Sequence, residues 1–288
     1  MRCTALSAAL FAAGSLAANC NGRAELCDRK YSEVSFIGSH NAPFVGFGPA
    51  DNQFVSVTEQ LDLGVRFLTG QTQEKRGNPQ MCHTSCFLED AGPLKDYLGE
   101  VKSWIDGHEN EVVTLLITNG DAIDINKFAD AFKSSGLDRY VFTPDRKLGL
   151  KDWPTLGELI SSGKRVIVFM DYNMDTSKVP YILDEFAYYF ETPFSPTEDN
   201  FVQCDIDRPG QVSADDRMFL ANHNLNIEIF KGLLIPDPLH ARDTNSIESI
   251  SEQTEICKKN YGRNPNVVLL DFVNVGDTIK TQDHLNGF

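Results

Sequence analysis

Two histidines in this chain have the surroundings expected of an acid–base pair. His40 follows the apolar stretch VSFIG, and His83 lies between Cys82 and Cys86. Histidine titrates near neutral pH, so one ring can take a proton from a nucleophile while another donates one to a leaving group. The sequence therefore predicts general acid–base chemistry if the fold brings the two rings together.

Short runs rich in Val, Ile, Leu and Phe recur along the chain, and each ends in polar side chains. Runs of this kind are typical of strands buried on both faces. Further strands are expected near 80–84 and 232–236. Six clear runs end, in order, at His40 and Asn41, Thr69 and Gln71, Thr118 and Asn119, Asp171 and Tyr172, Asn222 and His223, and Asp271.

Amphipathic helical patterns separate these runs. They span residues 92–107, 126–136, 155–163, 181–190 and 249–262, the last opening on a Ser-x-x-Glu capping pattern. Alternating buried strands and helices predict an α/β fold, a single (β/α) barrel of TIM-barrel type over residues 19–288. A doubly wound open sheet is the alternative, weakened because no Gly-rich nucleotide-binding loop follows any strand.

In a closed barrel the last strand lies beside the first, and reactive groups lie at the carboxyl ends of the strands. Asp271 would then meet His40 and fix its tautomer. Successive barrel strands would bring His83 to the same site. The other histidines lack a motif and are interpreted as structural or surface residues, except His223, which ends a strand-like run and stays ambiguous.

The N-terminus and the cysteines indicate the secretory pathway. Residues 1–18, MRCTALSAALFAAGSLAA, have the short apolar run and small-residue end of a signal peptide. Six cysteines remain, and an even number in an oxidising compartment predicts disulfides with 15 possible connectivities. Proximity in sequence favours Cys20–Cys27 and Cys82–Cys86, which leaves Cys204–Cys257. A zinc site at Cys82, His83 and Cys86 is the alternative.

Composition bounds the function further. Hydrophobic residues make up 41% of the chain, which predicts a globular body. The formal net charge of −15 argues against binding nucleic acid or anionic membranes in general. After residue 18 no apolar run approaches the ~20 residues of a transmembrane helix. We expect a secreted, extracellular protein and a monomer.

The segments FIGSHNAP, QLDLGVRFLTGQ, MCHTSC and LKDYLGEVKSWIDGHENEVVTLLIT occur in an order that resembles the phosphatidylinositol-specific phospholipase C X-domain family. The chain is most similar to its secreted fungal branch of PLC-like phosphodiesterases, from about Cys27 to about Asn286. The resemblance implies a distorted barrel that cleaves a phosphodiester by attack of a neighbouring substrate hydroxyl, through a cyclic phosphate. It also implies roles for individual residues: His40 as general base, His83 as general acid, Asp271 as support for the base, and Asn41 as a metal ligand or orienting residue.

The family's charge-stabilising groups are replaced here. Metal-dependent relatives hold calcium with carboxylates at the positions of Thr69, Gln71 and Thr118, and metal-independent relatives have an arginine at Gln71. The transition state carries extra negative charge that a cation must meet. Neutral oxygens hold Ca²⁺ or Mg²⁺ weakly, so the expected Ca²⁺ or Mg²⁺ site is weak or absent, and no cofactor is predicted. Candidate replacements for these groups are the cationic Arg66, Lys75 and Arg76 and the carboxylate Asp171.

The leading hypothesis is a secreted phosphoric diester hydrolase acting on a small phosphodiester or a phospholipid. Its substrate contacts would be Asn41, Gln71, Asp171 and Tyr172. The second hypothesis is a catalytically weak or inactive extracellular binding barrel. A third is a metal-dependent phosphodiesterase of the glycerophosphodiester or sphingomyelinase D kind, ranked last because the required acid-x-acid pair is absent.

Overall fold

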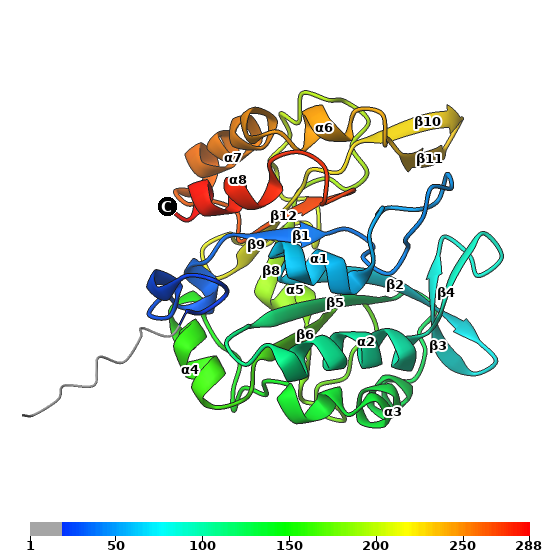
Figure 1. The fold of residues 1–288 in the computed structure, drawn as a ribbon, viewed down its shortest axis with the longest axis vertical. Coiled ribbons are helices and arrows are strands. Elements are labelled where there is room, and N and C mark those ends of the chain that lie inside the picture. Colours follow the sequence, from blue (N-terminus) through cyan, green and yellow to red (C-terminus); the bar gives the residue numbers. More distant parts are fainter. Residues whose placement is uncertain (1–18) are drawn as a thin grey trace, which may run out of the picture.

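Eight parallel strands curl into an incomplete barrel in the computed structural model, which describes residues 19–288 (Figure 1). The signal peptide predicted at 1–18 lies outside the described residues. The barrel strands are β1 (Phe36–Ser39), β2 (Phe67–Lys75), β5 (Val113–Asn119), β6 (Val166–Met170), β7 (Ile182–Asp184), β8 (Tyr189–Glu191), β9 (Met218–Asn222) and β12 (Val267–Leu270). They pair in the order β7-β6-β5-β2-β1-β12-β9-β8, without pairing between β7 and β8. The predicted distorted TIM-type barrel is confirmed, with an open seam between these two strands.

Four further strands lie outside the barrel. β3 (Asn78–His83) pairs antiparallel with the outer part of β2 and with β4 (Glu89–Pro93), while β10 (Asn226–Phe230) and β11 (Leu233–Pro236) form a separate hairpin. The strands predicted near 80–84 and 232–236 therefore exist, but their expected place in the barrel is wrong. The β10–β11 hairpin is largely exposed and β3 is only partly buried, whereas the barrel strands are mostly buried on both faces.

Two apolar layers follow from the two-residue period of the strands. Phe36 and Phe67 point into the barrel with Tyr189, whereas Ile37 and Leu68 point outward beneath the helices. The interior layer fills the barrel below its carboxyl ends. The site must therefore lie above this interior layer, at the carboxyl ends where loops follow the strands.

The helices are α1 (Val57–Leu63), α2 (Leu94–Gly107), α3 (Ile125–Ser135), α4 (Leu156–Ser161), α5 (Glu185–Tyr188), α6 (Ala241–Thr244), α7 (Ile247–Tyr261) and α8 (Thr278–Leu285). Helices are confirmed within four predicted segments, although α7 begins a turn earlier than expected, after an N-cap at Ser246. The helix predicted at 181–190 is wrong, since that segment forms β7, α5 and β8. Its apolar residues are buried on all sides, so it lacks the polar face of a surface helix.

Three disulfides, Cys20–Cys27, Cys82–Cys86 and Cys204–Cys257, confirm the predicted pairing. The second excludes the zinc alternative, because bonded sulfurs cannot serve as thiolate ligands, and closes a short loop directly after His83. The third ties the segment between β8 and β9 to α7. Within residues 19–288, no helix has the length and apolar character needed to cross a bilayer.

Candidate active site

A pocket of about 320 Å³ opens at the carboxyl ends of the barrel strands. Its wall includes His40, His83, Asn41, Gln71 and Asp171, five of the residues singled out in the sequence. A larger groove of about 470 Å³ lies beside β3 and α3, but neither histidine contributes to it. The smaller pocket is therefore the candidate active site.

His40 directly follows β1, and its ring is held by Asp271. The His40 backbone amide donates to the carbonyl of Leu270, and this hydrogen bond fixes the position of His40 relative to the end of β12. The ring Nδ1–H donates to Asp271 Oδ1 over 2.8 Å, so the predicted contact is present. With the proton on Nδ1, Nε2 remains as the basic nitrogen.

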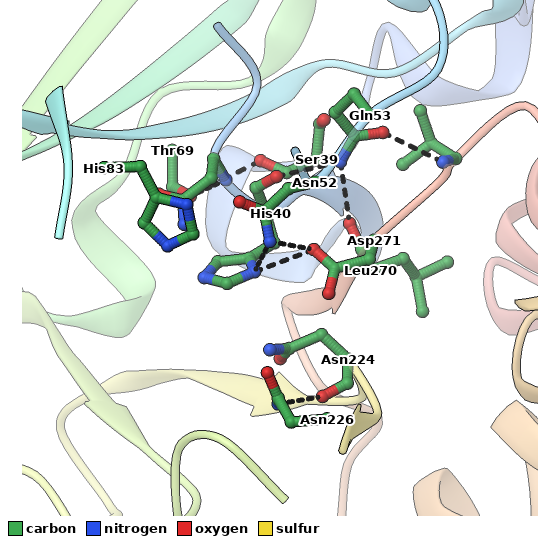
Figure 2. Close-up of polar contacts among 12 residues, drawn as sticks. Ser39, His40, Asn52, Gln53, Thr69, His83, Asn224, Asn226, Leu270 and Asp271 are labelled. Carbon is green, nitrogen blue, oxygen red and sulfur yellow. Dashed lines mark hydrogen bonds and ion pairs between the residues drawn. The ribbon is translucent and has the colours of Figure 1, made fainter. Parts of the chain in front are cut away.

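Asn52 and Gln53 support this pair from the loop before α1 (Figure 2). Asn52 Nδ2 donates to Asp271 Oδ1 over 2.8 Å, and Gln53 Nε2 donates to the carbonyl of His40 over 2.8 Å. Gln53 Oε1 accepts from the Val273 amide. Sequence reasoning missed both residues, because two amides in an irregular loop carry no periodic signal of burial.

His83 reaches the site from the end of β3. The prediction that it comes from a barrel strand is wrong, because β3 is an antiparallel strand laid against β2. Its Nδ1–H donates to the carbonyl of Ala50 over 2.6 Å, and the ring stacks on Phe44. Burial lowers the pKa of His83, the Ala50 carbonyl opposes this, and the charge of nearby His40 lowers it further. Figure 2 shows both rings beside the same space.

Neutral side chains occupy the positions at which the family resemblance implies calcium ligands or an arginine. Thr69 Oγ1 accepts from the Asn41 amide, Gln71 Oε1 from the Thr84 amide, and Thr118 Oγ1 from the Thr72 amide. No group of three or more His, Cys, Asp or Glu side chains in the described chain is arranged to hold a metal ion. The donor set does not fit Ca²⁺, which favours carboxylates.

Asn41 contributes a free donor to the pocket. Its backbone has a φ of 51°, and the residue is buried. Within residues 19–288 no hydrogen-bond acceptor reaches its buried Nδ2. An unpaired buried amide is costly, and it is well suited to a phosphate oxygen.

The positive charge of the pocket comes from Arg208, which sequence reasoning missed. Arg208 donates through Nε and Nη2 to Glu191 Oε2, at 3.1 and 2.5 Å, and through Nη1 to the hydroxyl of Tyr172. Its place in the irregular segment between β8 and β9 offered no signal. Two sequence candidates lie elsewhere: Arg66 pairs with Glu111 behind the sheet, and Lys75 pairs with Asp90.

Asp171 and Tyr172 differ in their relation to the pocket. Asp171 lines it, and burial raises the pKa of this carboxyl to about 6, against the opposing effect of hydrogen bonds from the Asn119 and Tyr172 amides. The Tyr172 side chain is not part of the pocket wall and reaches it only through Arg208.

Comparisons with known proteins give matches over most of the chain. The family model described as PI-PLC X 1 matches residues 26–286. The Arthroderma benhamiae protein named "PI-PLC X domain-containing protein 1" is 55% identical over 273 residues, which cover 93% of this chain and 89% of that protein. Another protein of that organism, named "Uncharacterized secreted protein", is 44% identical over 90% of this chain and 61% of its own length.

Solved structures share the fold at low identity. The phosphatidylinositol-specific phospholipase C from Listeria monocytogenes matches with a TM-score of 0.62 and 16% identity, over 91% of this chain and 96% of that one. A variant of the Staphylococcus aureus phosphatidylinositol-specific phospholipase C gives a TM-score of 0.62 at 12% identity, over 90% and 94% of the two chains.

Proposed function

This chain belongs to the PI-PLC X domain family, and on that premise we propose that it is a secreted phosphoric diester hydrolase acting on a phospholipid. One observation carries the proposal. Both pocket histidines have Nδ1 engaged, by Asp271 and by the Ala50 carbonyl, so each has Nε2 left for chemistry. Such a pair can act on two oxygens of one phosphodiester.

In the proposed reaction, His40 Nε2 takes the proton of the attacking hydroxyl, and Asp271 stabilises the imidazolium that forms. Protonated His83 donates from Nε2 to the leaving oxygen and returns to the neutral form, with its Nδ1–H still bonded to Ala50. The Asn41 amide donates to a phosphate oxygen. When the attacking hydroxyl belongs to the substrate head group, the product is a cyclic phosphate.

An apolar rim supports a lipid substrate. Phe47, Phe87 and Phe230 are 87%, 100% and 71% exposed. Phe47 lies on the loop that holds Ala50 and Asn52, Phe87 follows His83, and Phe230 lies on the β10–β11 hairpin, whose Leu234 and Pro236 line the pocket. These segments project from the same side of the barrel (Figure 1). Exposed aromatic side chains around a site mark an interaction surface.

Secretion is proposed on three grounds. A relative carries the name "Uncharacterized secreted protein", the described chain has three disulfides, and its first 18 residues have the pattern of a signal peptide.

The proposal is tested by incubating the purified protein with vesicles that contain inositol, glycerol, choline or ethanolamine phospholipids, and with the corresponding soluble phosphodiesters, with and without excess chelator. We expect release of phosphorylated head groups that is insensitive to the chelator. Absence of turnover on inositol, choline, ethanolamine and glycerol diesters would instead favour the catalytically inactive binding barrel. The neutral side chains of Thr69, Gln71 and Thr118 are the observation that supports this alternative. Loss of turnover in chelator would favour the metal-dependent hypothesis.

Replacing Phe47, Phe87 and Phe230 together with serine is expected to lower turnover of vesicle lipid by at least about tenfold, because even one inserted aromatic ring contributes about 1.5–3 kcal/mol when buried. Turnover of a soluble diester should stay unchanged, since none of these rings lines the pocket. The matched control is Leu63→Ser, an exposed apolar residue at the end of α1. Equal losses on both substrates would contradict the role of the rim.

The rate should fall as the pH rises through the slightly acidic range. His83 must be protonated to act as the acid, and burial lowers its pKa below the usual 6.5. The descending limb of kcat/KM should therefore lie below pH 6.5, with a slope of about tenfold per pH unit. A profile of kcat/KM that rises toward alkaline pH would contradict the assignment of His83 as the acid.

A further inference from the structure

The wall of the pocket opposite the histidines holds more acid than base. Asp171 follows β6, Glu185 begins α5 after β7, and Glu191 ends β8. Arg208 neutralises Glu191 through two hydrogen bonds. We call these three carboxyls the acidic wall; two of them have no cation of their own among the described pocket-lining residues.

Glu185 is the least satisfied member of the acidic wall. It is 1% exposed, and in the described part of the chain neither of its carboxyl oxygens has a hydrogen-bond partner. Burial, followed by the charge of Glu191, raises the pKa of Glu185 well above its usual value. A buried carboxyl beside another carboxylate, at the edge of a pocket, lacks a donor that a ligand can supply.

Asp171 presents a second free acceptor. Its Oδ1 accepts from the amides of Asn119 and Tyr172 over 2.9 and 2.7 Å, and both bonds go to this one oxygen. Since Asp171 lines the pocket, its other oxygen is available to a ligand. The carboxyl oxygens of Asp171 and Glu185 are thus acceptors in a part of the pocket that has few protein hydrogen-bond donors.

Arg208 is the cation of the described pocket wall, and its charge opposes the rise in the pKa of Asp171 and of Glu185. Its hydrogen bonds, however, go to Glu191 and Tyr172, so it gives neither of these carboxyls a donor.

Two other arginines are engaged away from the pocket. Arg66 pairs with Glu111 on the outer side of the sheet, and Arg165 donates to the carbonyls of His108 and Ile105. A ligand hydroxyl would supply one donor but no charge. An ammonium supplies three donors and a positive charge, so it would stabilise the ionised forms of Asp171 and Glu185 that burial disfavours in the empty pocket.

We propose that the acidic wall binds a protonated amine on the substrate head group, so that the preferred substrate carries an ammonium in addition to the hydroxyl beside its phosphate ester. The inference rests on the proposed function for the position of the phosphate, which lies at His40 and His83. The amine then lies across the pocket, with its N–H groups directed to Asp171 and Glu185.

The test compares matched phosphate monoesters by calorimetry at neutral pH: 2-aminoethyl and 3-aminopropyl phosphate, the corresponding hydroxyalkyl phosphates, and phosphocholine. We expect the better aminoalkyl ester to bind about tenfold more tightly than its hydroxyl analogue, as charge-assisted hydrogen bonds require. Phosphocholine should bind less tightly than the aminoalkyl ester, because its cation has no N–H. Equal affinities for amine and hydroxyl would overturn the inference.

Glu185→Gln and Asp171→Asn should each reduce the amine preference to about threefold or less, with little effect on the hydroxyl analogue. Both substitutions keep the side-chain shape, and Asn at position 171 can still accept from the two amides. Glu185→Gln should also raise the Tm, because it removes an unsatisfied buried acid beside Glu191. Retention of the full amine preference in both variants would overturn the inference.

Failure of this inference is separable from failure of the proposed function, because binding is measured without turnover. If the wild-type protein turns over a diester but binds the amine and hydroxyl esters with equal affinity, the amine site is contradicted and the proposed hydrolase is not. Amine preference in a protein that turns over no diester would support the site and contradict the proposed hydrolase.

Discussion

His40→Ala and His83→Ala should each lower kcat/KM for a phosphodiester by about a thousandfold, within the range of 10²–10⁴ typical of a lost general acid or base. The two rings share one pocket, and each has Nδ1 engaged in a hydrogen bond. The effects should differ with the leaving group. A substrate that loses nitrophenolate needs no acid, so His83→Ala should recover much of its rate there, whereas His40→Ala should not.

The double variant should be little worse than the more damaged single variant, because residues that act in one step have non-additive effects. A matched control is His108→Ala. His108 stacks on Trp104 and lies outside the pocket, so its removal should leave kcat/KM unchanged. Loss of activity in His108→Ala equal to that in His40→Ala would indicate damage to the fold rather than to the reaction.

Asp271→Asn is expected to lower kcat by about 10³-fold, because an amide nitrogen facing His40 Nδ1 favours the wrong tautomer and cannot stabilise the imidazolium. The loss should appear in kcat more than in KM, since Asp271 acts on the base and not on the bound substrate. Asn52→Ala should cost about tenfold, since Asn52 contributes one hydrogen bond to the Asp271 carboxylate.

The ratio of these two effects is the informative quantity. Asn52 shares Asp271 Oδ1 with the His40 ring, so it positions the carboxylate without replacing it. Circular dichroism and the Tm of both variants should stay close to those of the wild type. An Asp271→Asn variant with normal kcat would show that His40 does not act as a base supported by this carboxylate.

The parts of the site that could be predicted follow from barrel geometry. The first and last strands of a barrel are neighbours, so the polar ends of the runs at His40 and Asp271 had to meet. The register of β1 and β12 places Ser39 beside Leu270, and the next residues of both strands form the contact. Surface helices such as α2 could also be predicted, because apolar residues that repeat every 3.6 positions on one face are typical of an amphipathic helix.

The parts that could not be predicted lie in segments whose sequences show no clear helix or strand periodicity. β7, α5 and β8 form one short segment buried on all sides, so strand and helix patterns look alike there. Asn52 and Arg208 reach the pocket from irregular loops. The burial of Asn52 and the pairing of Arg208 with Glu191 become visible only when distant segments are brought together.

Phosphorus NMR of the reaction mixture tests the central claim most directly. The substrate is a phospholipid whose head group has a hydroxyl beside the phosphate ester. The wild-type protein should convert the diester resonance into that of a cyclic phosphate. The His40→Ala/His83→Ala double variant, checked to have a Tm close to that of the wild type, should produce no cyclic phosphate. Turnover by the double variant at the wild-type rate, or no turnover by the wild type, would contradict the account.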